Sequence, residues 1–145
     1  MSASAVVSVR LSQDEAGRLR LLAKRMGRSA SDVGAQLLAE SLRQADFAFI
    51  EFRDSPVGRQ AYVQGSRLAV WQVITLLRDH QNDAAKVAAH LRWPEAKVHA
   101  AVAYADGYPD EIEDAIREND SGSFETLSRL LPGLQRMNAK SRDSR

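Results

Sequence analysis

The first 43 residues constrain the fold more than any other part of the chain. They begin with an alternating run at residues 6–11, which predicts one short β-strand. Two segments with helical spacing follow, and no strand-forming run accompanies them. A single strand leaves a row of backbone N–H and C=O groups unpaired. We therefore expect a second copy of the chain to supply the partner strand.

Capping residues delimit the two predicted helices. Ser12 and Glu15 have the spacing of a capping box, and they predict a first helix over 13–26 that ends at Gly27. Ser29 predicts the start of a second helix over 30–43. The first N–H groups of a helix have no partner within it, so this second start is suited to binding a phosphate.

The two faces of the predicted strand differ in character. One face is apolar and should pack on the helices; it consists of Val7, Val9 and Leu11. The opposite face carries Val6, Ser8 and Arg10. Serine can contact any base edge, and arginine can form a pair of hydrogen bonds with guanine in the major groove. This second face therefore indicates a ribbon that enters a DNA groove.

The order strand, sixteen residues from Leu11 to Gly27, and then Arg28-Ser29 at the second helix resembles the ribbon-helix-helix family of Arc/MetJ-like repressors. In that family two strands pair antiparallel across a dimer and lie in the major groove. The resemblance implies a homodimer that binds operator DNA. It implies base contacts from Val6, Ser8 and Arg10 and phosphate contacts near Arg28, Ser29, Ala30 and Ser31. Val6 departs from the polar residue usual at its position. A unit of this kind that only dimerises is the alternative.

The charge of the chain is distributed unevenly although its net value is only +1. Residues 1–45 carry +3, residues 46–120 carry −5, and residues 121–145 carry +3. Such a division suggests different partners for different segments. The absence of cysteine excludes disulfides and thiolate metal sites. No apolar run reaches the roughly 20 residues of a membrane helix, and no signal peptide is evident, so we expect a cytoplasmic protein.

A second domain over 46–118 is predicted next. Its boundary, near residues 44–50, is indicated by a cluster of large apolar side chains: Phe47, Phe49, Ile50 and Phe52. A Gln64-Gly65 turn predicts a short hairpin between Tyr62-Val63 and Arg67-Leu68. Helical patterns follow over 71–79, over 83–91 with Asp83 as the cap, and from Pro94 onward. The last two form a pair similar to a helix-turn-helix.

Three strings in this domain resemble a small uncharacterised helix-turn-helix family over about residues 48–117: GSRLAVW at 65–71, AAVAY at 100–104 and PDEI at 109–112. Members of that family often occur in VapB-type antitoxins, encoded beside a PIN-type nuclease toxin. Lys97 and His99 are its candidates for a DNA groove. The acidic charge of the domain disfavours phosphate contact, so a packing or protein-binding role stays open.

The sequence predicts no catalytic or metal site, and we expect no enzyme activity and no cofactor. His80, His90 and His99 lack the spacing of metal ligands. A group of carboxylates is typical of a solvated helical face; it contains Asp106, Asp110, Glu111, Glu113 and Asp114. No phosphate-binding glycine loop or nucleophile elbow is present. The aromatic side chains Trp71, Trp93 and Tyr104 are expected in the core.

The last part of the sequence, residues 119–145, is predicted to form a linker at 119–123 and then an amphipathic tail. Its stripe contains Phe124, Leu127, Leu130, Leu131, Leu134 and Met137, beside Arg129 and Arg136. Pro132 predicts two short helical segments. The tail either docks on the chain's own core or becomes ordered in a partner's groove. In the second case Arg129 and Arg136 would neutralise the carboxylates of a nuclease active site.

These patterns and resemblances predict a mainly α fold. Its parts are a ribbon-helix-helix unit over 1–45 with an intermolecular two-stranded ribbon, a small helix-turn-helix-like domain with a short β-hairpin, and a C-terminal tail. The expected function is that of a type II antitoxin that binds a PIN-type nuclease toxin and represses its own operon, as a homodimer or in a larger assembly with the toxin. Two alternatives stay open: a ribbon-helix-helix regulator without a toxin partner, and an adaptor that uses the first unit only to dimerise.

Overall fold

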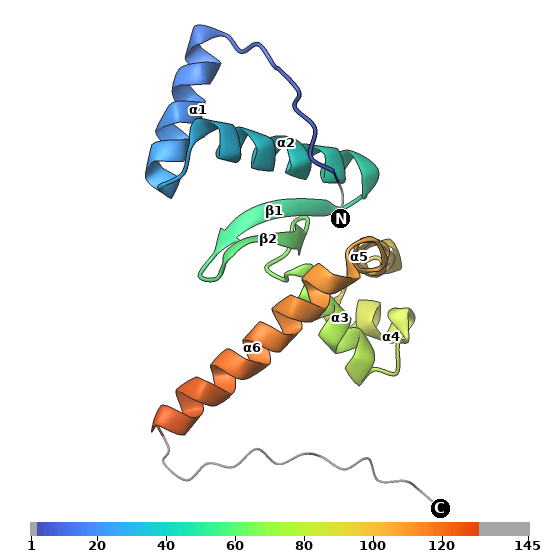
Figure 1. Cartoon of the computed structure of the whole chain (residues 1–145). Helices are drawn as coiled ribbons and strands as arrows, with labels where there is room; N and C mark the ends of the chain where they lie inside the picture. The colour runs from blue at the N-terminus through green and yellow to red at the C-terminus, as the bar shows by residue number, and fades with distance from the viewer. Residues whose placement is uncertain (1–2, 131–145) are drawn as a thin grey trace, which may run out of the picture. The chain divides into compact units, whose positions relative to one another are not determined.

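The chain folds into two compact units, Met1–Asp46 and Phe47–Arg145. The fold was obtained as a computed structural model, which describes residues 3–130. Figure 1 shows that this part of the chain is mainly helical, and its one regular sheet is a two-stranded antiparallel hairpin. The predicted mainly α class is therefore confirmed.

The first unit contains helix α1 (Gln13–Met26) and helix α2 (Ala30–Asp46). The predicted capping box begins α1, because the Ser12 amide donates to Glu15 Oε2 at 3.0 Å and the Glu15 amide donates to Ser12 Oγ at 3.2 Å. Left-handed backbone at Gly27, with φ 64°, ends the helix where the sequence predicts. Helix α2 continues three residues beyond the predicted end at Arg43.

The two helices of this unit pack through small side chains. Ala23 of α1 is 3% exposed and Val33 of α2 is fully buried. A Cβ added to Gly34 would lie 3.5 Å from Leu19 Cδ2, which shows that the backbone of α2 comes close to α1 at this point. Ala23 and Val33 are the only buried apolar side chains among residues 3–46.

The second unit begins with strands β1 (Ile50–Ser55) and β2 (Gly58–Val63), which pair antiparallel from Ile50–Val63 to Ser55–Gly58. The sequence predicts its hairpin one turn later, around Gln64-Gly65. A turn does form there, closed by the Val63 amide bonding to the Leu68 oxygen at 3.0 Å and by an isolated bridge between Tyr62 and Ala69. The longer pairing precedes this turn in the chain, because the six residues of β1 pair with the six residues of β2.

Three helices follow with nearly the predicted bounds: α3 (Val70–Asp79), α4 (Ala84–Leu91) and α5 (Glu95–Gly107). Asp83 caps α4, with its Oδ1 accepting from the Lys86 amide at 3.1 Å. Arg92 ends α4 in the left-handed region at φ 56°, and Pro94 precedes the first residue of α5. A turn of three residues therefore joins α4 to α5.

The core of the second unit lies between the hairpin and these helices. Its buried side chains are Ile50, Ala61, Val63, Val70, Val73, Ile74, Leu77, Val87, Ala88, Val98, Ala101, Tyr104 and Ile112. Tyr104 is fully buried, as predicted, and its ring lies 5.4 Å from Phe47, 6.2 Å from Phe52 and 5.0 Å from Tyr108. Trp71 and Trp93 are only partly buried against this core.

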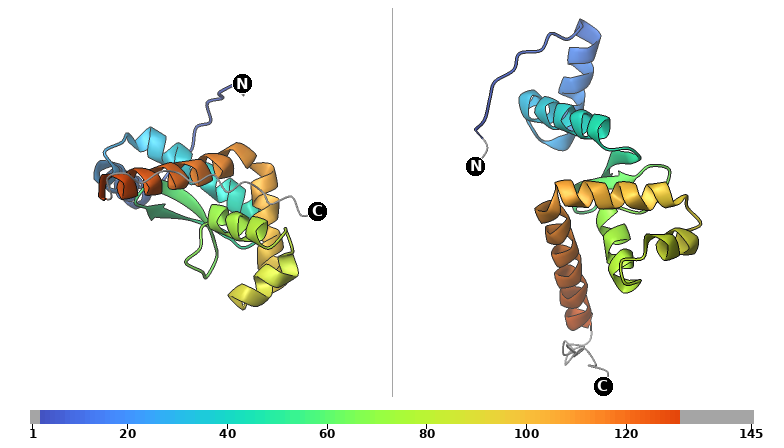
Figure 2. Two further views of the ribbon diagram at one scale, coloured as in Figure 1. Left: turned by 90° about the horizontal axis from the view of Figure 1, so that it is seen from below. Right: turned by 90° about the vertical axis from the view of Figure 1, so that its right-hand side faces the viewer.

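Helix α6 (Pro109–Leu130) leaves the end of α5 at a sharp angle (Figure 2). It runs unbroken through residues 119–123, where the sequence predicts a linker. Asparagine, serine and glycine are poor helix formers, but each costs at most about 1 kcal/mol once a helix is nucleated. Ten preceding residues of α6 supply that nucleus, so the local signal for a linker is overridden.

Candidate nucleic-acid interface

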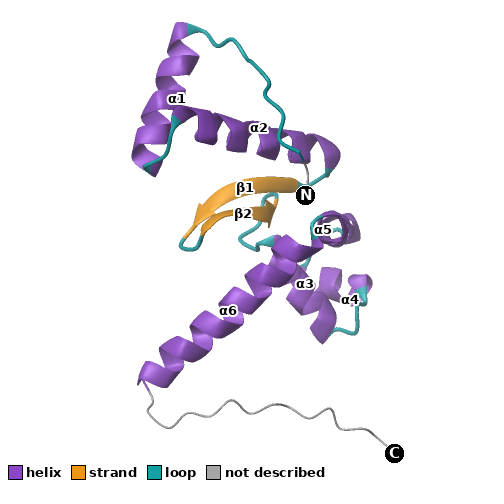
Figure 3. Cartoon of the chain, viewed as in Figure 1, coloured by secondary structure: helices purple, strands orange, loops and turns teal. Residues whose placement is uncertain are grey.

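The predicted DNA-reading segment is exposed and has no regular secondary structure in the single chain. Residues 3–11 are drawn as a loop in Figure 3, and every one of them is exposed. The three residues expected to form the apolar face are included: Val7 is 75%, Val9 is 64% and Leu11 is 48% exposed. Ser8 and Arg10 are also exposed, and Val6 is 98% exposed. The strand itself is thus not formed within one copy.

The start of α2, where the sequence predicts phosphate contacts, is a capped helix terminus with Arg28 exposed beside it. Ser29 Oγ accepts from the Asp32 amide at 3.1 Å, while the amides of Ala30 and Ser31 lie in the first turn. Arg28 is exposed beside them and donates a hydrogen bond to Gln36 Oε1. Asp32 places one carboxylate in the same turn, so Arg28 supplies the positive charge that an anion would require there.

The first unit leaves large apolar side chains uncovered. Leu21 of α1 is 56% exposed, and Leu38 and Leu42 of α2 are 48% and 60% exposed. These lie in the same unit as the exposed valines of residues 6–9. Apolar surface of this extent on a unit with so small a core is typical of a protein interface.

The helix-turn-helix-like pair α4–α5 is less suited to DNA binding than the first unit. Lys97 Nζ donates to the backbone oxygen of Gln64 at 3.2 Å, and His99 Nε2 lies 3.1 Å from Glu95 Oε1. Both residues that the sequence singles out for a groove thus have partners in their own unit. The first turn of α5 also carries the carboxylate of Glu95, which would repel a phosphate.

The acidic residues around α6 are divided among separate contacts. Glu111 Oε2 accepts from the Tyr104 hydroxyl at 2.6 Å, and Asp114 lies 3.3 Å from Arg117. Glu113 pairs with Arg78 of α3. This hydrogen bond lowers the pKa of Glu113 from its ordinary 4.5 and raises the pKa of Arg78. Among residues 3–130, no three His, Asp or Glu side chains are grouped so that they could hold a metal ion.

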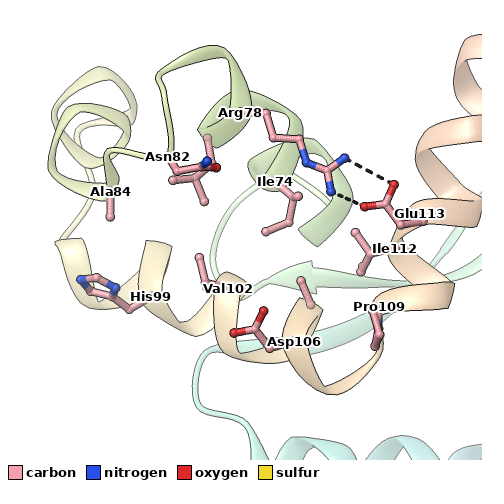
Figure 4. A pocket seen from close by; sticks show the side chains of 12 residues that line it. Ile74, Arg78, Asn82, Ala84, His99, Val102, Asp106, Pro109, Ile112 and Glu113 are labelled. Carbon is pink, nitrogen blue, oxygen red and sulfur yellow. Dashed lines mark hydrogen bonds and ion pairs between the residues drawn. The ribbon is translucent and has the colours of Figure 1, made fainter.

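A groove of about 420 Å³ opens between α3, α5 and the start of α6 (Figure 4). Its apolar floor contains Ile74, Leu77, Val102, Ala105 and Ile112. The Arg78–Glu113 pair stands on one side of the opening, and the carboxylate of Asp106 stands on the other. The sequence gives no sign of this groove, because Arg78 and Glu113 are 35 residues apart.

The residues predicted to bind a toxin fall partly outside the described chain. Phe124, Leu127 and Leu130 lie within α6, and Arg129 is exposed near its end. Leu131, Leu134 and Arg136 lie outside the described residues. The break expected at Pro132 lies outside them as well.

Comparison with models of known protein families found no match, and neither did comparison with curated proteins or with solved structures. Within residues 3–130, no helix has both the length and the apolar character needed to cross a membrane.

Proposed function

We propose that this chain is the antitoxin of a type II toxin–antitoxin system. In this proposal its first unit forms a homodimer that binds operator DNA and represses its own operon, and its tail binds and silences a PIN-type nuclease. The proposed role is binding alone.

The observation that carries the proposal is the incomplete core of the first unit. Two buried apolar side chains, Ala23 and Val33, are too few for a unit of 46 residues to be stable alone. A second copy would cover the exposed apolar residues of 6–11, α1 and α2, and would pair the backbone of the extended segment. Such pairing would form the antiparallel ribbon of the family that this unit resembles.

Charge and exposure favour DNA as the ligand of that ribbon. Residues 1–45 carry +3, and Ser8, Arg10, Arg28 and Ser31 are exposed. The acidic second unit, with Lys97 and His99 already paired, is the weaker candidate for phosphate contact. We therefore assign DNA binding to the first unit.

The toxin-binding half of the proposal rests on the resemblance of residues 48–117 and on the basic, amphipathic tail. Arg129 is exposed near the end of α6, where it is free to approach an acidic partner site. An arginine placed among nuclease carboxylates would occupy the place of their metal ion.

Co-expression with the product of the neighbouring gene tests the antitoxin role. The chain is purified through a tag and the mass of whatever co-elutes is measured. A stable complex with a nuclease whose activity is inhibited supports the proposal. A homodimer without a companion contradicts it and favours a regulator that acts alone.

Deletion of residues 121–145, or Arg129→Ala with Arg136→Ala, should relieve the inhibition of the nuclease. Unchanged inhibition would show that the tail does not silence the toxin.

The DNA-binding role is tested by Arg10→Ala, measured by fluorescence anisotropy on a DNA fragment selected by the wild-type protein. Loss of one paired base contact should weaken binding by about 1–3 kcal/mol, which is about fivefold to 150-fold. Arg20→Ala is the matched control, since it removes one exposed charge from α1. Wild-type binding should fall steeply as salt is raised. Equal losses in both variants would show that only net charge matters.

A further inference from the structure

The groove on the second unit has the chemistry of a docking site for a basic, amphipathic segment. We propose that it binds the chain's own C-terminal segment, residues 131–145. The side chain of Met137 would rest at the Ile112 end of the floor, and a basic side chain would reach Asp106. The inference depends on the second unit and does not rest on a toxin.

The groove combines an apolar floor with one uncompensated acidic edge. Ile74, Leu77 and Ile112 are at most 9% exposed, and the half-buried Val102 lies beside them. On one edge Glu113 is neutralised by Arg78. On the other edge the exposed Asp106 stands apart from this pair (Figure 4), and the structure shows no ion pair or hydrogen bond to it among the side chains that it describes. A basic side chain that lies over the floor can therefore pair with the carboxylate of Asp106.

The C-terminal segment has the complementary composition. Leu131, Leu134 and Met137 recur at intervals of three, and basic residues follow them. Residues 131–145 contain four basic residues and one acidic residue, so they carry +3. Residues 47–120 contain eight basic and twelve acidic residues, so they carry −4. Charges of opposite sign favour the encounter, and Met137 supplies an apolar contact with the near end of the floor.

The segment is long enough to return to the groove. Leu130, the last residue of α6, lies 17 residues after Glu113, so the helix carries the chain about 26 Å from the groove. When extended, the seven residues from Leu130 to Met137 span up to about 25 Å, and the ten residues to Lys140 span up to about 36 Å. Lys140 and Arg142 can therefore reach Asp106 within the same chain.

Paramagnetic NMR on the full-length protein tests the proposal. The chain has no cysteine, so Ser144→Cys accepts a single nitroxide label. We expect the label to attenuate the amide signals of Val102, Ala105 and Asp106. Asp106→Lys should restore the groove signals. Glu118→Lys is the matched control, because it makes the same charge change on α6 and should leave the attenuation intact.

A charge swap makes the test specific. Lys140→Glu with Arg142→Glu should also restore the groove signals, and combining these changes with Asp106→Lys should bring the attenuation back. Groove signals as strong with the label as without it would overturn the proposal. Attenuation that appears only when labelled protein is mixed with isotope-enriched unlabelled protein would overturn it too, because the segment would then dock on a second copy.

Discussion

Single small residues decide how closely the aromatic cluster of the second unit packs. A Cβ added to Gly107 would come within 2.9 Å of Phe47 Cζ. The Phe47 ring has little freedom to move away, because it packs edge-on against Tyr104 at 5.4 Å and against Tyr108 at 5.9 Å. Gly17 in α1 is the opposite case, since an added Cβ there meets nothing within 4 Å.

We predict opposite effects of the same substitution at these two positions. Gly107→Ala should lower the free energy of unfolding by about 1–3 kcal/mol, because the core must shift to admit the methyl group. Gly17→Ala should raise it by about 0.5–1 kcal/mol, because alanine favours the helix. Urea denaturation at one fixed protein concentration measures both. Equal effects would show that packing against Phe47 does not limit the size of the side chain at residue 107.

At the scale of elements, α6 is held to α3 by the pair Arg78 and Glu113 as well as by the buried Ile112. The hydrogen bond from Arg78 is the main reason for the lowered pKa of Glu113. The folded state therefore favours the ionised carboxylate. This contribution to stability is present above the ordinary pKa of 4.5, and it is lost as the pH falls through the lowered value.

We predict that Arg78→Gln raises the pKa of Glu113 toward its ordinary value, as followed by carbon NMR of the side-chain carboxyl group. Glu15 is the internal control, because its pKa is lowered by hydrogen bonds from Ser12 in the first unit and should not change. An unchanged pKa of Glu113 would mean that another group, such as Arg117, stabilises the carboxylate.

Local chemistry explains which elements could be predicted from the sequence. Ser12, Gly27 and Asp83 act through neighbours at most five residues away, so the ends that they set for α1 and α4 are readable from the chain. The sequence patterns miss the β1–β2 hairpin and predict a linker where α6 runs through 119–123, because strand pairing and helix propagation depend on more distant residues. The groove depends on contacts between α3, α5 and α6, for which one sequence contains no local signal.

At the scale of the whole molecule, the first unit exposes more large apolar side chains than it buries among residues 3–46. Its exposed residues 6–11 alternate in a way that predicts two faces, yet the single chain provides no neighbour for either. The proposal of a second copy follows from the sequence pattern, because an isolated strand has no pairing partner, whereas the geometry of the proposed pairing depends on the partner chain.

We predict that Val9→Asp prevents dimer formation and Ser8→Asp does not. In the proposed dimer Val9 lies on the covered face, so each dimer would bury two carboxylates and its dissociation constant should rise about 100-fold or more. Ser8 lies on the DNA face, so its substitution should weaken DNA binding alone. Sedimentation equilibrium measures the first effect and anisotropy the second. Similar dimer dissociation constants for the two variants would contradict the assignment of faces.

The turn between α4 and α5 leaves little freedom for a change in loop length. Left-handed backbone at Arg92 reverses the chain, and the Trp93 amide bonds back to the Ala88 oxygen at 2.9 Å. An inserted residue would have to break the Trp93–Ala88 hydrogen bond or shift α5, which would strain the contact of Lys97 with Gln64. The end of the β1–β2 hairpin is different, because Val57 there is 71% exposed. Insertions and deletions among natural variants should therefore accumulate at Pro56-Val57 and be excluded from residues 92–94.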